Sequence, residues 1–339
     1  MKTKLLAALL CGMNLLAQAA FPEKPITVIV PYPPGGATDI LARKLAGPLG
    51  QRLGQPVIVE NKAGAGTAIG AAQVAKSAPD GYTLLISSNT TFTVNAALKN
   101  SLPYDPQKDF ESVGLIGSSP LVLLANPKVP ANNVKELLAL AQRDPKGLNF
   151  GSFGVGTTAH LAGEMFKVMT GANMVHVAYR GSAPAMTDLI GGQIPLSFDT
   201  SVASLPQMAN GKVKAIAVTT RQRSPQMPQV PTVAEAGFPD YEMVPWIGYV
   251  GRRGMPAEVS ARLTKAIQDS LSDPVVKADL QKVGLDVLYQ PGAAYDSRVA
   301  QELPLERWYR EARIRRIGEG PSEVHRMVVA RSILGSRRD

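Results

Sequence analysis

The sequence predicts an α/β protein of two domains, each built on a mostly parallel β-sheet. Short β-branched segments alternate with segments of helical periodicity, which is typical of parallel strands joined by helices. A strand, a glycine-rich turn and a helix follow one another once in each half of the chain. About 320 residues follow the apolar N-terminal segment, a length that suits two domains of ordinary size.

The first half begins with a strand at residues 26–30 and a helix at residues 40–53, whose Leu41, Leu45 and Leu49 share one face. The next expected elements are strands at residues 57–60, 83–87, 113–116 and 121–125 and a helix at residues 68–76. The last two strands flank a run of small residues that ends in a breaker, Gly117-Ser118-Ser119-Pro120. We therefore place a crossing between the domains here.

The second half repeats the alternation. Strands are expected at residues 148–150, 175–177, 196–198 and 215–218, and helices at residues 134–142 and 185–190 and around Leu161, Met165, Phe166 and Met169. A proline-rich stretch spans residues 225–231, a strand near residues 246–250 returns to the first domain, and amphipathic segments follow at residues 259–271 and 275–283. The predicted division is a first lobe of residues 20–118 and 247–310, a second lobe of residues 119–246, and an arginine-rich tail at residues 311–339.

The turn after the first strand, residues 31–36, has the properties of an anion-binding loop. Its prolines keep the chain extended, and Gly35 and Gly36 let the backbone approach a ligand because they have no Cβ. We expect Thr38 or Asp39 to cap the following helix. The first turn of that helix presents unpaired N–H groups and the positive end of the helix dipole.

A second glycine-rich loop, residues 151–158, leads into a helix in the second half. Within it, Gly154-x-Gly156-x-x-Ala159 matches a dinucleotide fingerprint, but no acidic residue follows about twenty positions later, so no nucleotide cofactor is expected. If the two loops face each other across a cleft, backbone donors from both sides can hold a small anion. This is a binding architecture first, and it becomes catalytic only if suitable side chains join it.

The N-terminus resembles a secretory signal. Lys2 and Lys4 precede an apolar run at residues 5–16, and Ala17-Gln18-Ala19 gives a small-residue cleavage site, so residues 1–19 are predicted to be a signal peptide. The alternative is a buried N-terminal helix. Cys11, the only cysteine, lies inside the apolar run, and no later segment is apolar enough to cross a bilayer. We expect a soluble, exported protein in a bacterial periplasm, without disulfides.

Composition argues against several other functions. Hydrophobic residues make up 45% of the chain and charged residues 19%, as in a globular protein. The net charge is +9, but outside the C-terminal tail the basic residues are scattered and form no basic and aromatic face, so no nucleic-acid partner is expected. No G-x-S-x-G elbow is present, and with three histidines and no cysteine after Cys11, neither a metal site nor a catalytic centre is predicted.

A few side chains could join the backbone donors at the cleft. Asp199 ends a predicted strand and either contacts the ligand or caps the turn or helix that follows. His160 either touches the ligand or packs locally, and Arg180 either pairs with a carboxylate or is solvated. The aromatic residues that either wall the pocket or pack between the domains are Tyr32, Tyr179 and Trp246.

Several motifs in a fixed order carry a resemblance that covers about residues 22–300. They are Val30-Pro31-Tyr32-Pro33-Pro34-Gly35-Gly36-Ala37-Thr38-Asp39, Val59-Glu60-Asn61-Lys62-Ala63-Gly64-Ala65-Gly66, Pro79-Asp80-Gly81-Tyr82-Thr83-Leu84, Gly156-Thr157-Thr158-Ala159-His160-Leu161-Ala162-Gly163-Glu164, Val177-Ala178-Tyr179-Arg180-Gly181 and Val230-Pro231-Thr232-Val233-Ala234-Glu235-Ala236-Gly237. With these motifs the chain resembles the periplasmic solute-binding proteins of tripartite tricarboxylate transporters, the Bug or TctC-like family.

The resemblance implies a two-lobed periplasmic binding protein of type II, a Venus flytrap that closes on a small carboxylate and is not an enzyme. It implies that backbone amides and ordered waters hold the carboxylate, and that the monomeric receptor is recognised by two transporter membrane subunits. The ligand-binding residues implied are Tyr32, Gly36, Ala37, Asp39, Ser88, Asn89, Thr157, Ala159, His160, Tyr179 and Asp199. The chain departs from the family after Glu306-Arg307-Trp308, where relatives usually end and this chain continues with an arginine-rich run.

The sequence leaves the ligand open among amino acids, di- and tricarboxylates and aromatic acids. Two alternatives use the same cleft: an exported hydrolase or isomerase, and a ligand sensor for a signalling partner. The first needs a base beside a nucleophile, which the sequence does not show. If Asp199 lies at the distal end of the site, we expect it to favour a ligand amine over a second carboxylate.

Overall fold

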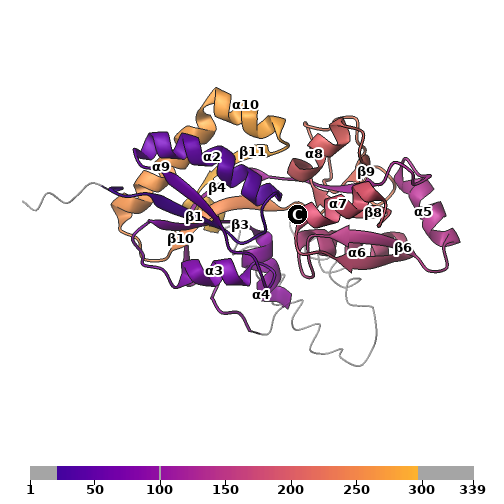
Figure 1. The fold of residues 1–339 in the computed structure, drawn as a ribbon, viewed down its shortest axis with the longest axis horizontal. Helices are drawn as coiled ribbons and strands as arrows, with labels where there is room; N and C mark the ends of the chain where they lie inside the picture. Colours follow the sequence, from indigo (N-terminus) through magenta and orange to yellow (C-terminus); the bar gives the residue numbers. More distant parts are fainter. Residues whose placement is uncertain (1–20, 99–100, 297–339) are drawn as a thin grey trace, which may run out of the picture.

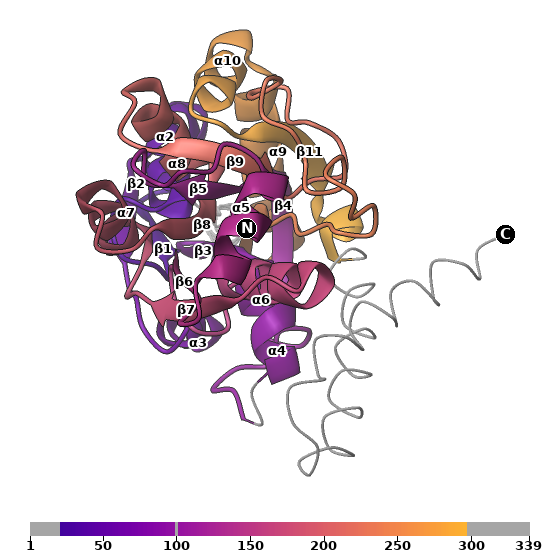
Figure 2. The same ribbon diagram turned by 90° about the vertical axis from the view of Figure 1, so that its right-hand side faces the viewer.

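The computed structural model describes residues 21–98 and 101–296, which form two lobes side by side (Figure 1). Viewed end-on, the second lobe stands in front of the first (Figure 2). The predicted signal peptide and the predicted tail at residues 311–339 lie outside the described residues. None of the helices within residues 21–98 and 101–296 combines the length and the hydropathy that crossing a membrane requires.

The first lobe contains a six-stranded sheet in the order β11-β4-β10-β3-β1-β2. The strands are β1 (Ile26–Val30), β2 (Val57–Asn61), β3 (Thr83–Ser88), β4 (Phe110–Ser118), β10 (Trp246–Arg252) and β11 (Asp286–Pro291). β1 pairs in parallel with β2 and β3, whereas β10 is antiparallel to β3 and β4, and β11 is antiparallel to β4. Four of these six strands therefore point the same way.

The second lobe contains a five-stranded sheet in the order β7-β6-β8-β5-β9. The strands are β5 (Leu121–Ala125), β6 (Leu148–Ser152), β7 (Met174–Ala178), β8 (Leu196–Thr200) and β9 (Lys214–Val218). β6 is parallel to β7 and β8, and β5 is antiparallel to β8 and β9, so four of these five strands share a direction. The prediction of two mostly parallel sheets is confirmed for strand direction.

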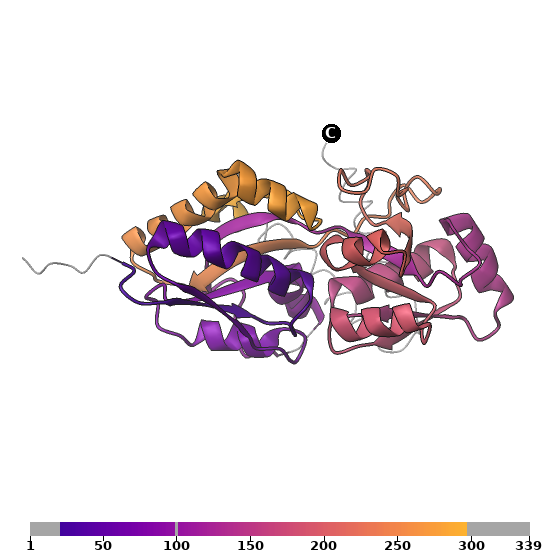
Figure 3. The ribbon, with the colours of Figure 1, turned by 45° about the horizontal axis from the view of Figure 1, so that its top comes forward.

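Helices cover both faces of each sheet (Figure 3). In the first lobe, one face packs on α2 (Ala37–Leu53), α9 (Ala257–Ser272) and α10 (Pro274–Lys282), and the other on α3 (Ala68–Ala75) and the π-helical turn η1 (Thr90–Val94), which α4 (Asn95–Leu98) follows. In the second lobe, α5 (Val134–Arg143) and α6 (Thr158–Thr170) cover one face, and α7 (Ser182–Gly191) and α8 (Ser201–Ala209) cover the other. The cores therefore lie on both sides of both sheets.

Within residues 101–296 the chain crosses between the lobes twice, and the two crossings touch. β4 leads into β5 through residues 119–120, and the chain returns into β10 after Pro245. The Ser119 N–H donates to the Pro245 carbonyl at 3.0 Å. Adjacent crossing strands of this kind allow the lobes to rotate about them.

α8 joins the lobes on one side of this crossing. Its Val202 is buried in the core of the first lobe, although the helix follows β8 of the second. The Ser201 hydroxyl donates to the Gly284 carbonyl at 2.6 Å. Gly284 has a φ of +99°, and a Cβ there would lie 2.8 Å from Cδ1 of Leu205, so α8 sits directly on the first lobe.

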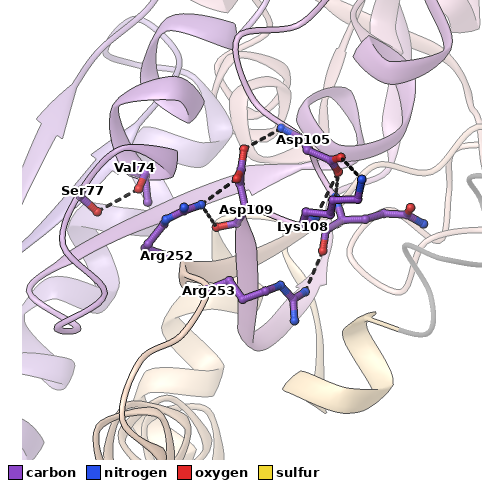
Figure 4. A network of polar contacts seen from close by, with 8 residues as sticks. Val74, Ser77, Asp105, Lys108, Asp109, Arg252 and Arg253 are labelled. Carbon is purple, nitrogen blue, oxygen red and sulfur yellow. Dashed lines mark hydrogen bonds and ion pairs between the residues drawn. The ribbon is translucent and has the colours of Figure 1, made fainter.

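Residues 105–109, which lead into β4, are held at the other end of β10 (Figure 4). The Arg252 guanidinium donates to the Asp109 carboxylate at 2.7 Å, and the Asp105 N–H donates to the same carboxylate at 2.7 Å. Arg253 donates to the Gln107 carbonyl at 2.8 Å. This network fixes the segment at the end of the first lobe opposite the crossings, because Arg252 ends the strand that Trp246 begins.

The main differences from the sequence expectations concern short or irregular elements. α8, β11 and η1 were not predicted. α2 begins at Ala37 rather than at residue 40, and Gly36, not Thr38 or Asp39, is its N-cap. The Asp39 side chain instead accepts the N–H of Gly35, one residue before the cap.

Candidate functional site

Asp39 stabilises the first glycine-rich loop from within its own lobe. Its carboxylate accepts hydrogen bonds from the Gly35 N–H at 3.0 Å, from Arg43 Nε at 3.0 Å and from Asn61 Nδ2 at 2.9 Å. Burial raises the pKa of Asp39, but these hydrogen bonds and the Arg43 charge outweigh it and hold the pKa below its usual value. Through these bonds Asp39 sets the loop conformation, and it is not among the residues that line the cleft.

The ends of β1 and β3 bring Tyr32 and Ser88 together at the cleft. The Tyr32 hydroxyl and Ser88 Oγ are 2.9 Å apart, and Asn61 Nδ2 donates to the Tyr32 carbonyl at 3.1 Å. Burial raises the pKa of Tyr32, so the hydroxyl is neutral. The next residue, Asn89, is buried, and its Oδ1 has no hydrogen-bond partner among the residues that the structure describes.

The second glycine-rich loop leads into α6 and is held by two histidines. Thr157 caps the helix by accepting the His160 N–H at 3.4 Å. His160 Nδ1 accepts the Gly156 N–H at 3.1 Å, and its ring stacks on His176 at 4.1 Å between centroids. Burial lowers the pKa of both histidines, that of His176 to about 4, so both are neutral near pH 7. The structure thus gives His160 a local packing role.

Several other predicted residues face their own lobe. Ala159 is fully buried in the second-lobe core. The Tyr179 hydroxyl donates to Asp188 at 2.7 Å, and Arg180 is exposed. Trp246 stacks on Phe92 in the first-lobe core, with ring centroids 6.0 Å apart, and so packs rather than lining the cleft.

Asp199, the penultimate residue of β8, is buried, and its carboxylate accepts hydrogen bonds from the residues that begin two helices. One carboxylate oxygen accepts the Ser182 hydroxyl at 2.6 Å, and the other accepts the Thr200 N–H at 2.7 Å and its hydroxyl at 3.3 Å. Asp199 thereby holds the beginnings of α7 and α8, and it also lines the cleft. Burial raises its pKa to about 6, although these hydrogen bonds lower it.

A cleft that is partly open to solvent lies between the lobes. The described residues that line it are Tyr32, Pro33, Gly36, Ala37, Thr38, Ser88, Phe153, Thr158, Gly181, Ser182, Asp199, Thr200, Pro245 and Ile247. The beginnings of α2, α6, α7 and α8 therefore converge on one cavity. Helix N-termini carry free N–H groups and a partial positive charge, so the cavity suits an anion.

Five of the eleven predicted ligand-binding residues lie in this lining, namely Tyr32, Gly36, Ala37, Ser88 and Asp199. The other six, Asp39, Asn89, Thr157, Ala159, His160 and Tyr179, are not among the lining residues. Sequence reasoning missed Ser182 and Thr200, which begin helices directly after Gly181 and Asp199. The sequence signal that could have identified them is a hydroxyl residue at the start of a helix, preceded by glycine in one case and by aspartate in the other.

The two lobes touch across the cleft. The Thr158 N–H in the second lobe donates to Thr90 Oγ1 in the first at 3.4 Å. A Cβ on Gly181 would lie 2.9 Å from Cγ of Pro33, and a Cβ on Gly36 would lie 3.7 Å from Cβ of Ser182. The beginnings of α2 and α7 therefore meet closely enough to enclose a small molecule.

The described residues offer little for catalysis. No group of three or more histidine, cysteine, aspartate or glutamate side chains in residues 21–98 and 101–296 could hold a metal ion. Ser152 and His176 lie 2.7 Å apart, but Ser152 is fully buried and neither residue lines the cleft. A substrate in the cleft would not reach this pair.

A two-lobed α/β protein whose cleft is lined by helix N-termini belongs to the class of periplasmic binding proteins. The family profile described as "Tripartite tricarboxylate transporter family receptor" matches residues 41–315. The chain belongs to this family of solute-binding receptors, as its motifs indicated.

Individual relatives agree with this assignment. BugT of Bordetella pertussis is 39% identical over 273 residues, which cover 80% of this chain and 84% of BugT. The structure of the periplasmic binding protein BugD has 36% identity and a TM-score of 0.81, over 86% of this chain and 98% of that chain. The structure of R. palustris Rpa4515 with adipate has 32% identity and a TM-score of 0.81, and the match covers 91% of this chain and 98% of that chain.

Proposed function

We propose that this protein is an extracytoplasmic receptor that captures a small carboxylate between its two lobes. The observation that carries the proposal is the convergence of four helix beginnings on one cleft, with no lysine, arginine or histidine among its described lining residues. Backbone N–H groups and hydroxyls can hold a carboxylate here without a cationic side chain. The adipate bound to the relative Rpa4515 is a ligand of this chemical kind.

The partner and the location are part of the same proposal. The family description supports delivery of the solute to a tripartite transporter, whose two membrane subunits recognise the closed receptor. The signal-like residues 1–19 support export to the periplasm. We propose that the receptor acts as a monomer, because each chain contributes both walls of its cleft.

A thermal-shift screen tests the carboxylate proposal. The protein, beginning at Ala20, is unfolded and refolded to remove carried-over ligand, and is then screened against amino acids and di-, tri- and aromatic carboxylates. A ligand at about a hundred times its Kd stabilises the folded state by about 2.7 kcal/mol, which raises Tm by several degrees. A ligand that binds and is recovered unchanged supports the receptor; a ligand that is consumed supports the hydrolase or isomerase. No shift with any carboxylate contradicts the proposal.

A further inference from the structure

Asp199 is the only acidic side chain among the described residues that line the cleft. Its three hydrogen-bond donors, the Ser182 hydroxyl and the N–H and hydroxyl of Thr200, are all neutral. Asp199 is 1% exposed, and within the described part of the chain it takes part in no ion pair. The cleft therefore contains a buried carboxylate without a cationic partner.

Such a group is costly to keep ionised. A buried charge needs a partner, and without one it favours its neutral form. The N-terminal ends of α7 and α8 offset part of this cost through their partial positive charge. The remainder is visible as the raised pKa of Asp199, about 6, for which burial is the largest cause. A cation brought by the ligand would supply the partner that the protein lacks.

Among its described lining residues, the cleft contains backbone donors at helix N-termini in both lobes and one carboxylate, that of Asp199, in the second lobe. On the first-lobe wall, the beginning of α2 presents backbone donors through Ala37 and Thr38, which suit a carboxylate. On the second-lobe wall, Asp199 presents an acceptor between Ser182 and Thr200. A zwitterion satisfies both walls, whereas a dicarboxylate brings a second negative charge toward Asp199.

We propose that the solute is an ammonium-bearing carboxylate, an amino acid in its zwitterionic form, and that Asp199 is the residue that recognises its ammonium group. This inference rests on the proposed receptor function and narrows its ligand class. The competing role for Asp199 is that of a protonated acid donating a hydrogen bond to a ligand carboxylate. If Asp199 binds an ammonium group, ligand affinity falls as the pH is lowered and Asp199 is protonated. If it donates a hydrogen bond as an acid, ligand affinity rises as the pH is lowered.

Few other titrating groups act on Asp199. Tyr32 is the only other ionisable side chain in the described lining, and burial keeps it neutral. Asp39 on α2 is paired with Arg43, and Asp188 on α7 accepts the Tyr179 hydroxyl. The histidines His160 and His176 lie behind the second loop, outside the lining. If ligand affinity changes between pH 5 and pH 8, and the change disappears in Asp199→Asn, the change is caused by titration of Asp199.

The experiment compares two panels by isothermal titration calorimetry on refolded protein at pH 8. One panel contains amino acids of three to six carbons with the amine at the α or the terminal carbon; the other contains dicarboxylates of matched length. We expect an amino acid to bind at least about tenfold more tightly than the matched dicarboxylate. Tighter binding of a dicarboxylate, or no binding by any amino acid, overturns the inference. The receptor proposal itself is contradicted only if the thermal-shift screen is also negative for every carboxylate.

The pH dependence and one substitution separate the two roles of Asp199. With a pKa of about 6 in the free protein, amino-acid affinity should fall about tenfold from pH 8 to pH 5, because a proton must leave Asp199 first. In Asp199→Asn we expect amino-acid affinity at pH 8 to fall about thirtyfold or more. An affinity that rises toward pH 5, or that Asp199→Asn preserves, assigns the protonated role and overturns the inference.

Two further variants serve as controls for local structural damage at Asp199 and for the loss of a negative charge elsewhere. Ser182→Ala removes one hydrogen bond from Asp199 but keeps its carboxylate, so the preference for amino acids over dicarboxylates should persist if Asp199 recognises the ammonium group. Glu258→Gln removes an exposed negative charge on α9 of the first lobe and should leave the preference and the pH dependence unchanged. Loss of the preference in Glu258→Gln, with folding intact by circular dichroism, overturns the assignment to Asp199.

Discussion

Gly181→Ala tests whether the contact between the lobes belongs to the ligand-bound state. Gly181 is the N-cap of α7 with a φ of +122°, and a Cβ there would lie 2.9 Å from Cγ of Pro33 in the first lobe. Ordinary carbon contacts are about 3.5–4.0 Å, so the added methyl requires a retreat of roughly 0.6–1 Å between these atoms. Overpacking of this kind costs about 1–3 kcal/mol, and a side chain at this φ costs about 1–3 kcal/mol in addition.

The two costs affect different measurements. Backbone strain lowers the free energy of unfolding, which urea denaturation reports. The contact with Pro33 opposes closure of the lobes, so calorimetry with the ligand found in the screen should show a Kd raised roughly five- to a hundredfold. Gly237→Ala is the matched control, because its φ is +105° and nothing lies within 4 Å of a Cβ there. We expect it to lower stability and leave the Kd unchanged.

A second variant removes the atom responsible for the clash. Pro33→Ala in the Gly181→Ala background deletes Cγ, so part of the lost affinity should return, beyond any effect of Pro33→Ala alone. If Gly181→Ala binds its ligand as the unmodified protein does, the lobes do not approach at this point in the bound state. The reasoning from the cross-cleft contact would then be refuted.

Three further predictions concern parts of the fold that support the cleft. Gly284→Ala should lower the free energy of unfolding by about 2–4 kcal/mol in urea denaturation, because its Cβ would meet Leu205 and its φ is +99°; a loss below about 1 kcal/mol would show that α8 can shift. The pKa of His176, about 4, lies below the unfolded value of 6.5, so the unfolded chain takes up more protons between these values and stability falls as pH drops through this window. Unfolding curves at pH 7 and pH 4.5 should show a smaller loss for His176→Gln than for the unmodified protein, and an equal loss would contradict the assignment. Asn61→Ala should cost about 1–3 kcal/mol in urea denaturation and weaken ligand binding in calorimetry, because Asn61 donates to Asp39 and to the loop carbonyl of Tyr32; unchanged stability and affinity would show that Arg43 alone holds the loop.

The strands that the sequence predicts best are those whose local pattern is sufficient to define them. The strand bounds at residues 26–30 and 121–125 agree with the structure, since each is an apolar, partly β-branched run that ends at proline or asparagine. β11 is missed because its polar and apolar residues form a half-exposed edge strand that ends in Pro291. α8 is missed because Pro206 interrupts a serine-rich segment. Pairing of β10 between β3 and β4 depends on long-range contacts that no local pattern reports.

The sequence predicts those parts of the site that the backbone forms, because the loop after a parallel strand can be located from the sequence. Gly36 and Ala37 line the cleft because a loop after a parallel strand must open at that edge of the sheet. The family resemblance implies that Asp39 and Tyr179 contact the ligand. The structure instead gives each a partner within its own lobe, Arg43 and Asp188, and the choice of partner is a tertiary property.

The position of β10 also orders the events of folding. The whole second lobe lies between β4 and β10 in the sequence, so a ribosome completes it before the middle strand of the first sheet exists. Until residues 246–252 emerge, β3 and β4 each present an unpaired edge, which is a template for aggregation. The second lobe can fold first as a contiguous unit. Nascent chains arrested before Trp246 should therefore contain a protease-resistant second lobe attached to an aggregation-prone first half that depends on chaperones.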